Sequence, residues 1–370
     1  GSLHSSTSTA WSGLTATTTD ALGHITTRVV LAWGPLTRVT DAAGGSTNYR
    51  SNAFGQLTQT SDAYGTIVMQ SAYNLRGMPT TLTNVNRGST TRVPNALGEV
   101  VSETTAKGQT RSHVYDLLGR LTSRSEPEGT STWTWGTIAD NTANAKYVGG
   151  LKALAGPGYA ESYVNDAYGR LKTRTVTSDA SYQIDYGYNT LGTLDTLTYP
   201  VSTAGYRLKL QYDYSNGVPV AIKDFNAPTT VIWSSTANDA RGAVIDETLG
   251  TNLRVLTGRD PLTGQMDYRQ AGVGGGSSLQ NLAYSWRVNG FSIGQSAVEK
   301  AGRQAKASRA WGAAGKLCES FTYDSLERLD TVSRNGTQTL NVDYDLIGNI
   351  SSRSDVGTYS YHASKKHAVT

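Results

Sequence analysis

Tyr115-Asp116-Leu117-Leu118-Gly119-Arg120-Leu121 is the stretch that decides the fold, because its pattern returns along the chain. The pattern is an aromatic residue, Asp or Asn, two variable residues, Gly, one further residue and an aliphatic residue. Glu327 replaces the glycine in one copy. The residues that define the motif are Tyr115, Asp116, Gly119 and Leu121; Tyr188, Asn189, Gly192 and Leu194; Tyr323, Asp324 and Leu329; and Tyr344, Asp345, Gly348 and Ile350.

The spacing of the copies is regular. Gly98 and Gly119 are 21 residues apart, as are Glu327 and Gly348, and Gly108 lies almost midway between the first two. A turn about every ten or eleven residues leaves room for a strand of about five or six residues and a short turn. The repeat therefore predicts consecutive β-hairpins.

The chemistry of the motif agrees with this interpretation. Asp or Asn at the first turn position accepts hydrogen bonds from backbone amides two residues on, and Gly at the fourth position adopts the left-handed conformation that closes the hairpin. We expect turns at Asp116 to Gly119, Asn189 to Gly192 and Asp345 to Gly348, and little helix. The predicted fold is all-β, an array of antiparallel hairpins.

Composition supports this fold and narrows the function. Gly occurs 40 times and Tyr 21 times, whereas only 17% of residues are charged; this is typical of β-structure with many turns. The single cysteine, Cys318, rules out an internal disulfide framework. A net charge of +4 is too weak to indicate nucleic-acid binding. We find no apolar run long enough to cross a bilayer, and no signal peptide.

We expect a tag or poorly ordered start at residues 1–17 and a continuous repeat array over residues 18–370. Three stretches break the phase of the repeat: residues 137–158, 271–278 and 297–316. The second is rich in Gly and reads as a flexible loop. The third is rich in Ala, Lys and Arg, and we expect a short helix or an ordered loop there.

The length of the array limits its shape. At about 21 residues per hairpin the chain makes roughly 30–35 strands, a strip of roughly 150 Å. Side chains fill only barrels of about eight strands. A closed strip of this length must therefore be hollow, flattened into a sandwich or wound as a spiral.

The motif resembles the YD repeats of the Rhs family, most clearly at Tyr115 to Thr122 and Tyr344 to Ile350. That family includes bacterial Rhs polymorphic toxins, shell components of ABC (Tc) toxin complexes, and teneurins. The resemblance implies a spiralling single-layer sheet that forms part of a hollow shell around a C-terminal toxin domain. The implied partners are the remaining shell segments and that toxin cargo, and the implied location is secreted or delivered at the cell surface.

The sequence departs from a complete member of the family. It lacks the Asp-Pro-rich core that ends Rhs shells and carries out their self-cleavage, and no toxin-like domain follows. The resemblance therefore implies a shell wall, and neither autoproteolysis nor toxicity. We expect the chain to be a segment of a longer protein.

No catalytic motif stands out, and the five histidines lack the spacing of metal ligands. We therefore predict no cofactor and no metal. The alternative function is an extracellular protein that binds carbohydrate or cleaves polysaccharide. Arg111, His113 and Tyr115 would share one strand face, where a base and a cation could serve β-elimination, although an ordinary strand face explains them as well.

Two further groups are candidates for contact with glycans or cargo. Trp133 and Trp135 alternate on one expected strand, so both point the same way, either to stack on sugar rings or to cover the sheet. The densest basic stretch, either a binding surface or a solvated loop, comprises Lys300, Arg303, Lys306 and Arg309.

Overall fold

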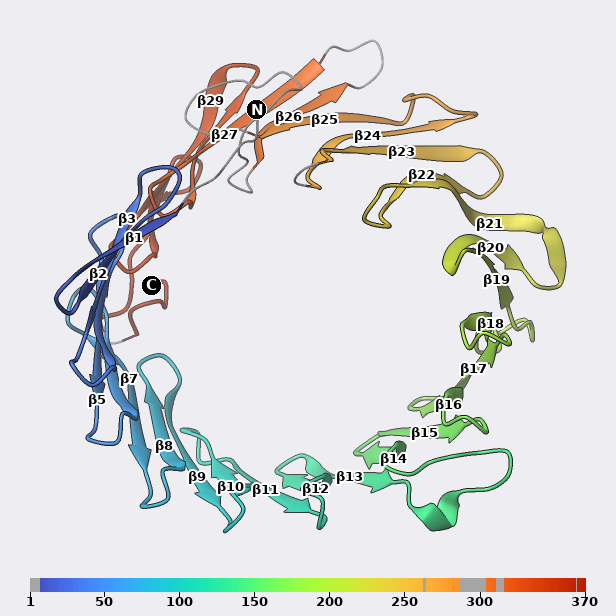
Figure 1. Ribbon diagram of the computed structural model, residues 1–370, viewed down its shortest axis with the longest axis horizontal. Helices are drawn as coiled ribbons and strands as arrows, with labels where there is room; N and C mark the ends of the chain where they lie inside the picture. The colour runs from blue at the N-terminus through green and yellow to red at the C-terminus, as the bar shows by residue number, and fades with distance from the viewer. Residues whose placement is uncertain (1–6, 262–263, 287–303, 311–315, 364) are drawn as a thin grey trace. The chain divides into compact units, whose positions relative to one another are not determined.

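The computed structural model describes residues 7–261, 264–286, 304–310, 316–363 and 365–370. The chain divides into two compact units. Unit 1 comprises Gly1–Arg92, Gly258–Gln270 and Ser278–Thr370, and unit 2 comprises Val93–Thr257 and Ala271–Ser277. Each unit is built almost wholly of antiparallel strands (Figure 1).

In unit 1, every strand pairs with its neighbours in sequence within two series. The first series is β1 (Ser8–Ser12), β2 (Thr15–Thr19), β3 (Ile25–Val30), β4 (Leu36–Thr40), β5 (Ser46–Ser51), β6 (Leu57–Ser61), β7 (Ile67–Tyr73), β8 (Pro79–Asn84) and β9 (Gly88–Pro94). The second series is β25 (Gln280–Trp286), β26 (Gln304–Ala310), β27 (Lys316–Tyr323), β28 (Leu329–Arg334), β29 (Thr337–Tyr344), β30 (Ile350–Arg353) and β31 (Gly357–Thr358).

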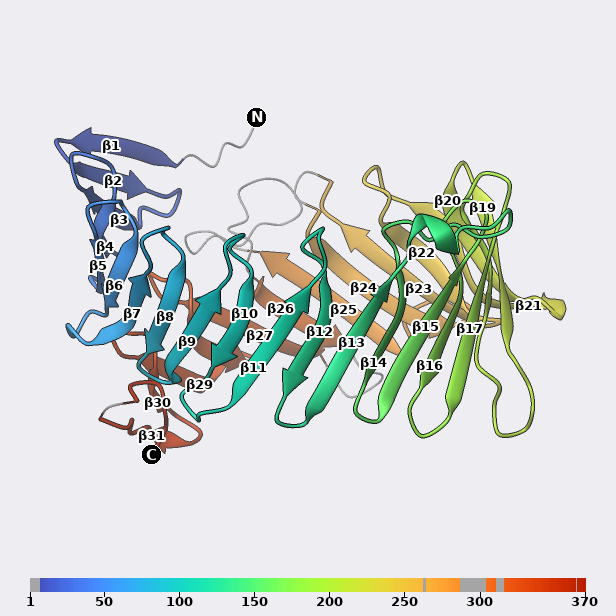
Figure 2. The ribbon, with the colours of Figure 1, turned by 90° about the horizontal axis from the view of Figure 1, so that it is seen from below.

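In unit 2 the strands lie side by side in chain order (Figure 2). They are β10 (Val100–Thr104), β11 (Thr110–Tyr115), β12 (Leu121–Glu126), β13 (Gly129–Trp135), β14 (Leu151–Gly156), β15 (Tyr159–Asn165), β16 (Leu171–Thr177), β17 (Ser181–Tyr188), β18 (Leu194–Thr198), β19 (Lys209–Ser215), β20 (Val218–Asp224), β21 (Ala227–Asn238), β22 (Val244–Leu249) and β23 (Leu253–Arg259). A 3-10 turn, η1 (Ile138–Asp140), precedes β14, and β24 (Met266–Val273) spans the boundary between the units.

The predicted array of antiparallel hairpins is confirmed, but four stretches differ from the sequence interpretation. Residues 271–273 of the expected loop at 271–278 belong to β24. Strands β1 and β2 already occupy part of residues 1–17. Residues 137–158 contain η1 and the paired strand β14. The expected helix or loop within 297–316 is wrong for Gln304–Ala310, which forms β26 between β25 and β27. Two neighbouring strands satisfy its backbone groups, and this outweighs the weak local preference of an Ala- and Lys-rich sequence.

Because successive strands reverse direction, their connections alternate between two edges. Within the described residues, we call the turns headed by Asp or Asn that follow odd-numbered strands YD turns, since they carry the motif, and those that follow even-numbered strands return turns. Among the YD turns are Asn95–Glu99, Asp116–Arg120 and Asn189–Thr193; Asp41–Gly45 and Asp62–Thr66 are return turns. The three predicted turns are present, and in each the glycine amide donates to the Asp or Asn carbonyl at 3.0–3.1 Å.

The sheet has almost no enclosed core. Among the described residues, the buried hydrophobic side chains are Ala16, Leu210, Val255, Ala271 and Val342. Most tyrosines and leucines of the strands are only half-buried. Contacts between neighbouring repeats along the strip must therefore supply much of the stabilisation, as in other repeat architectures.

Candidate functional site

The YD turn is a closed hydrogen-bonded unit, and Asp116 is at its centre. Its Oδ1 accepts hydrogen bonds from the backbone amides of Leu118 at 2.9 Å and Arg120 at 3.0 Å. Gly119 has φ of 75°, a left-handed conformation that is costly for other residues. A one-residue register shift between Val114 and Tyr115 accompanies the turn. The motif residues thus form the hairpin connection and leave no reactive group open.

In several of the described repeats, a tyrosine at the motif position ties its repeat to the preceding one. The Tyr188 hydroxyl donates to the carbonyl of Leu171, the aliphatic position of the repeat before it, at 2.8 Å. The same bond, at 2.7–3.0 Å, joins Tyr73 to Leu57, Tyr115 to Val100, Tyr214 to Leu194, Tyr344 to Leu329 and Tyr361 to Ile350. This bond explains the preference for tyrosine at this position, because phenylalanine could fill the space but not donate.

Trp135 occupies the tyrosine position of this series. Its indole Nε1 donates to the Leu121 carbonyl at 2.8 Å, and the Arg120 guanidinium lies 5.1 Å from its ring centroid. Trp133 lies on the same strand face, 5.7 Å from the Arg124 guanidinium. Both tryptophans are half-buried. Trp135 therefore has a structural role in the repeat. Its position in the sequence, 20 residues after Tyr115, is close to the period of the repeat and could have revealed this role.

A second link between repeats comes from the residue after the glycine. Arg170 Nε donates to Asp166 Oδ2 at 2.7 Å, and its guanidinium lies 4.3 Å from the ring centroid of Tyr188 in the next repeat. Arg328 joins Asp324 to Tyr344 in the same way, at 2.7 and 4.2 Å. Stacking of a cation on an aromatic face contributes about 0.5–1 kcal/mol at exposed sites. Each arginine thus bridges its own turn and the next aromatic residue.

The first and fifth positions of the turn are chemically matched. Asp116 pairs with Arg120, whose side-chain hydrogen bond holds the pKa of the Asp116 carboxyl below its usual value. Where Asn replaces Asp, a neutral or acidic partner replaces Arg. The bonds are Asn52 Nδ2 to Gln56 at 2.7 Å, Asn95 Nδ2 to Glu99 at 2.6 Å and Asn189 Nδ2 to Thr193 at 2.6 Å. The sequence contained this pairing, and our reading of the motif missed it.

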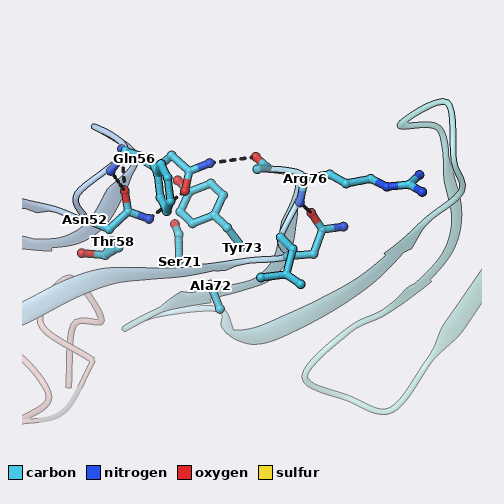
Figure 3. Close-up of a pocket in the computed structure, with 11 residues that line it drawn as sticks. Asn52, Gln56, Thr58, Ser71, Ala72, Tyr73 and Arg76 are labelled. Atoms are coloured by element: carbon cyan, nitrogen blue, oxygen red, sulfur yellow. Dashed lines mark hydrogen bonds between the residues drawn. The ribbon is translucent and has the colours of Figure 1, made fainter.

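A groove of about 480 Å³ lies between two consecutive YD turns of unit 1. Gln56 extends across it from the first turn, and its Nε2 donates to the Gly77 carbonyl of the second at 3.2 Å (Figure 3). Tyr73 lies in the groove, with its hydroxyl bonded to Leu57. Phe54 borders it and is 88% exposed. The amides in the groove thus hold the repeats together, and its apolar border faces solvent.

The strand face proposed for glycan cleavage is occupied by internal contacts. Arg111 Nε lies 3.1 Å from Glu126 Oε2, and its Nη1 lies 4.0 Å from Glu103 Oε1. The Tyr115 hydroxyl donates to Val100 at 3.0 Å. The buried Nδ1 of His113 has no hydrogen-bond partner among the described residues. The three side chains share a face, as alternation predicted, but the arginine and the tyrosine already have partners.

Unit 2 also contains a buried charge cluster that the sequence analysis missed. Glu161, only 7% exposed, accepts hydrogen bonds from Arg174 Nε at 2.7 Å and Nη2 at 2.6 Å, and from the hydroxyls of Tyr159 and Tyr163. These bonds, chiefly those from Arg174, lower the Glu161 pKa to about 2. Burial, together with Glu161, raises the pKa of Tyr163 to about 12. Such a saturated carboxylate is a poor proton donor or acceptor near neutral pH.

The basic stretch is only partly described. Lys300 and Arg303 lie outside the described residues. Lys306 and Arg309 belong to β26, where they pair across the sheet with Ser285 and Leu282. A contact of these residues, or of Trp133 and Trp135, with glycans or cargo stays a prediction.

Two common kinds of functional feature, a metal-binding cluster and a membrane-spanning helix, do not occur among the described residues. The described part of the chain has no cluster of three or more His, Cys, Asp or Glu residues placed to hold a metal ion. Within the same residues, no helix is long and apolar enough to cross a membrane.

Residues 95–131, which include two YD turns, match the family model described as RHS Repeat. That segment is therefore similar to an RHS repeat. The fold of the chain is similar to that of the Photorhabdus luminescens Tc holotoxin pore, with a TM-score of 0.79 and 16% identity over 98% of this chain and 21% of the other. The crystal structure of TcdB2-TccC3-Cdc42 is equally similar, with a TM-score of 0.79 and 18% identity over 98% of this chain and 22% of the other.

At these identities the structural similarity shows the fold. The chain spans about a fifth of the length of the Tc chains that it matches. No curated protein matches it. The resemblance drawn from Tyr115 to Thr122 and Tyr344 to Ile350 is confirmed, and it extends over nearly the whole chain as a fold.

Proposed function

We propose that this chain is a wall segment of an RHS-type shell that encloses a C-terminal toxin domain of its parent protein and helps to deliver it outside the producing cell. The observation that carries the proposal is the fold match over 98% of the chain to Tc toxin structures. The remaining shell segments and the toxin cargo are the partners in this proposal.

The organisation of the strip supports a wall rather than an enzyme. Hydroxyl bonds such as that from Tyr188 to Leu171 hold one repeat to the next, so the array can form a continuous surface of many repeats. The few polar clusters in it, including Glu161 with Arg174, are internally paired. Glycan processing has less support, because Arg111 already contacts two carboxylates and the Tyr115 hydroxyl is bonded within the sheet.

Limited proteolysis of the full-length parent protein tests the proposal. We expect the domain that follows the shell to resist protease in the intact protein and to be digested readily when produced alone. The matched variant is Gly119→Val, which should weaken the wall and speed digestion of the enclosed domain, whereas Arg120→Ala should do so less. Equal digestion of the enclosed and the isolated domain would contradict encapsulation.

A further inference from the structure

The tips of the YD turns in unit 2 form a row of exposed apolar side chains. The residue before the turn glycine is large and apolar in four of them, and its exposed fraction is 81% for Leu97, 76% for Leu118, 83% for Tyr168 and 86% for Leu191. These turns all follow odd-numbered strands, so they lie along one edge of the strip. Leaving a large apolar side chain in water forgoes roughly 1.5–3 kcal/mol, so a repeated exposed row indicates a binding edge.

Unit 1 shows one YD turn in contact with other turns. The backbone amide of Leu346, in the turn Asp345–Asn349, donates to the Tyr64 hydroxyl at 3.4 Å. The carbonyl oxygen of Leu346 lies 3.0 Å from the position that a Cβ on Gly45 would take. The last YD turn thus meets two return turns from the beginning of the chain, Asp41–Gly45 and Asp62–Thr66.

Both sides of this contact are partly shielded from solvent. Leu346 is 49% exposed, whereas Leu117 at the same position of its turn is fully exposed. Ile347 is half-buried, unlike Leu118. On the other side Gly45 is buried, and Asp62 is only 8% exposed. The return turns therefore provide a socket for a YD tip.

The chemistry of the socket explains its fit. Gly45 has no side chain, and a Cβ there would lie 2.8 Å from Asp41 Oδ2 as well as close to the incoming carbonyl. Asp62 Oδ1 is already bonded to the amides of Tyr64 and Thr66, which fixes the turn that carries Tyr64. The socket thus combines a bare backbone surface, an aromatic ring and a hydroxyl acceptor. An aliphatic tip that presents its backbone amide as Leu346 does is complementary to it.

We infer that the exposed YD tips of unit 2 are docking sites for return turns of another segment of RHS-repeat array, held by the same tip-in-socket contact. The inference rests on the proposed wall function and names the partner of that edge. The partner is a row of short Asp-x-x-Gly turns with a small residue after the glycine, as in Asp41–Gly45. The edges of two array segments would then meet turn against turn, without strand pairing.

The chain itself supplies the probe. Leu346→Asp places a charge in the internal contact and leaves the socket of unit 1 open for the YD tips of a second copy. We expect this variant to associate at least tenfold more tightly than the wild type in sedimentation across a dilution series, a change of about 1.4 kcal/mol. Adding Leu97→Ser, Leu118→Ser, Tyr168→Ser and Leu191→Ser to the same chain should reverse the gain.

A blocked socket provides the matched control. Gly45→Val combined with Leu346→Asp should release the last turn without gaining association, because neither tip then fits the socket. Circular dichroism would verify that every variant keeps its β-structure. The inference is overturned if Leu346→Asp does not raise association, or if the serine substitutions leave the raised association unchanged. Such a result would leave encapsulation untouched, because that is measured by protease protection of the cargo.

Discussion

The hydroxyl of Tyr188 offers a direct measurement of the link between repeats. Tyr188→Phe removes the donor to the Leu171 carbonyl, which lies 2.8 Å away on a half-buried face, and keeps the ring beside Arg170. A lost hydrogen bond of this kind costs about 1 kcal/mol. In a repeat array that cost should be local, so the population of opened states should rise about fivefold in β16, β17 and β18.

Hydrogen exchange followed by mass spectrometry measures this opening strand by strand. The matched control is Tyr186→Phe, two residues earlier on the same strand face, whose hydroxyl bonds to none of the described residues. We expect faster exchange for Tyr188→Phe in these three strands and almost none of this effect for Tyr186→Phe. Equal exchange in the two variants would refute the proposed link, and a uniform increase across unit 2 would refute its local character.

Three further predictions concern single positions. Gly119→Val should lower the free energy of unfolding by about 1–3 kcal/mol, because Gly119 has a positive φ and a Cβ there would lie 3.0 Å from Glu99 Oε1. Arg120→Ala should lower it by less than about 1 kcal/mol. Equal melting temperatures for the two variants would contradict this. Glu327 has φ of 63°, so Glu327→Gly should raise the free energy of unfolding by about 0.5–1 kcal/mol and give a higher denaturation midpoint. A lower midpoint would show that the side-chain contacts of Glu327 outweigh the strain. The Glu161 carboxylate should contribute its full stabilisation, at most about 3 kcal/mol, above its ordinary pKa of 4.5 and lose it as pH falls towards about 2. The denaturation midpoint of the wild type should therefore fall faster over this pH range than that of Glu161→Gln, and an equal or slower fall would contradict the prediction.

The sequence predicted the parts of this structure that depend on local chemistry. Gly119 and its equivalents marked the turns correctly, because a left-handed position excludes most other residues. The strand β26 escaped prediction, since pairing on both sides overrides the weak preference of Ala and Lys. Trp135 was placed on the right face, but its hydrogen bond was not foreseen, because the acceptor is a carbonyl in the preceding repeat.

Contacts between distant turns were beyond the reach of pattern analysis. Nothing in the local sequence of Leu346 distinguishes it from Leu117, yet one meets Tyr64 and the other faces solvent. The Glu161 cluster was in principle visible, because Tyr159, Glu161 and Tyr163 alternate on one strand. Its partner Arg174 comes from the next strand, and only the register of β15 against β16 identifies it.

The bond from each motif aromatic to the preceding repeat has a consequence for how such chains change length during evolution. Tyr188 needs only a carbonyl at the aliphatic position of the repeat before it, and Tyr344 finds the same acceptor in Leu329. Duplicating or deleting one whole repeat therefore leaves every aromatic with an equivalent acceptor. Recombination between repeats would be tolerated when it preserves this spacing, and the capacity of an enclosure built from them could grow by single units.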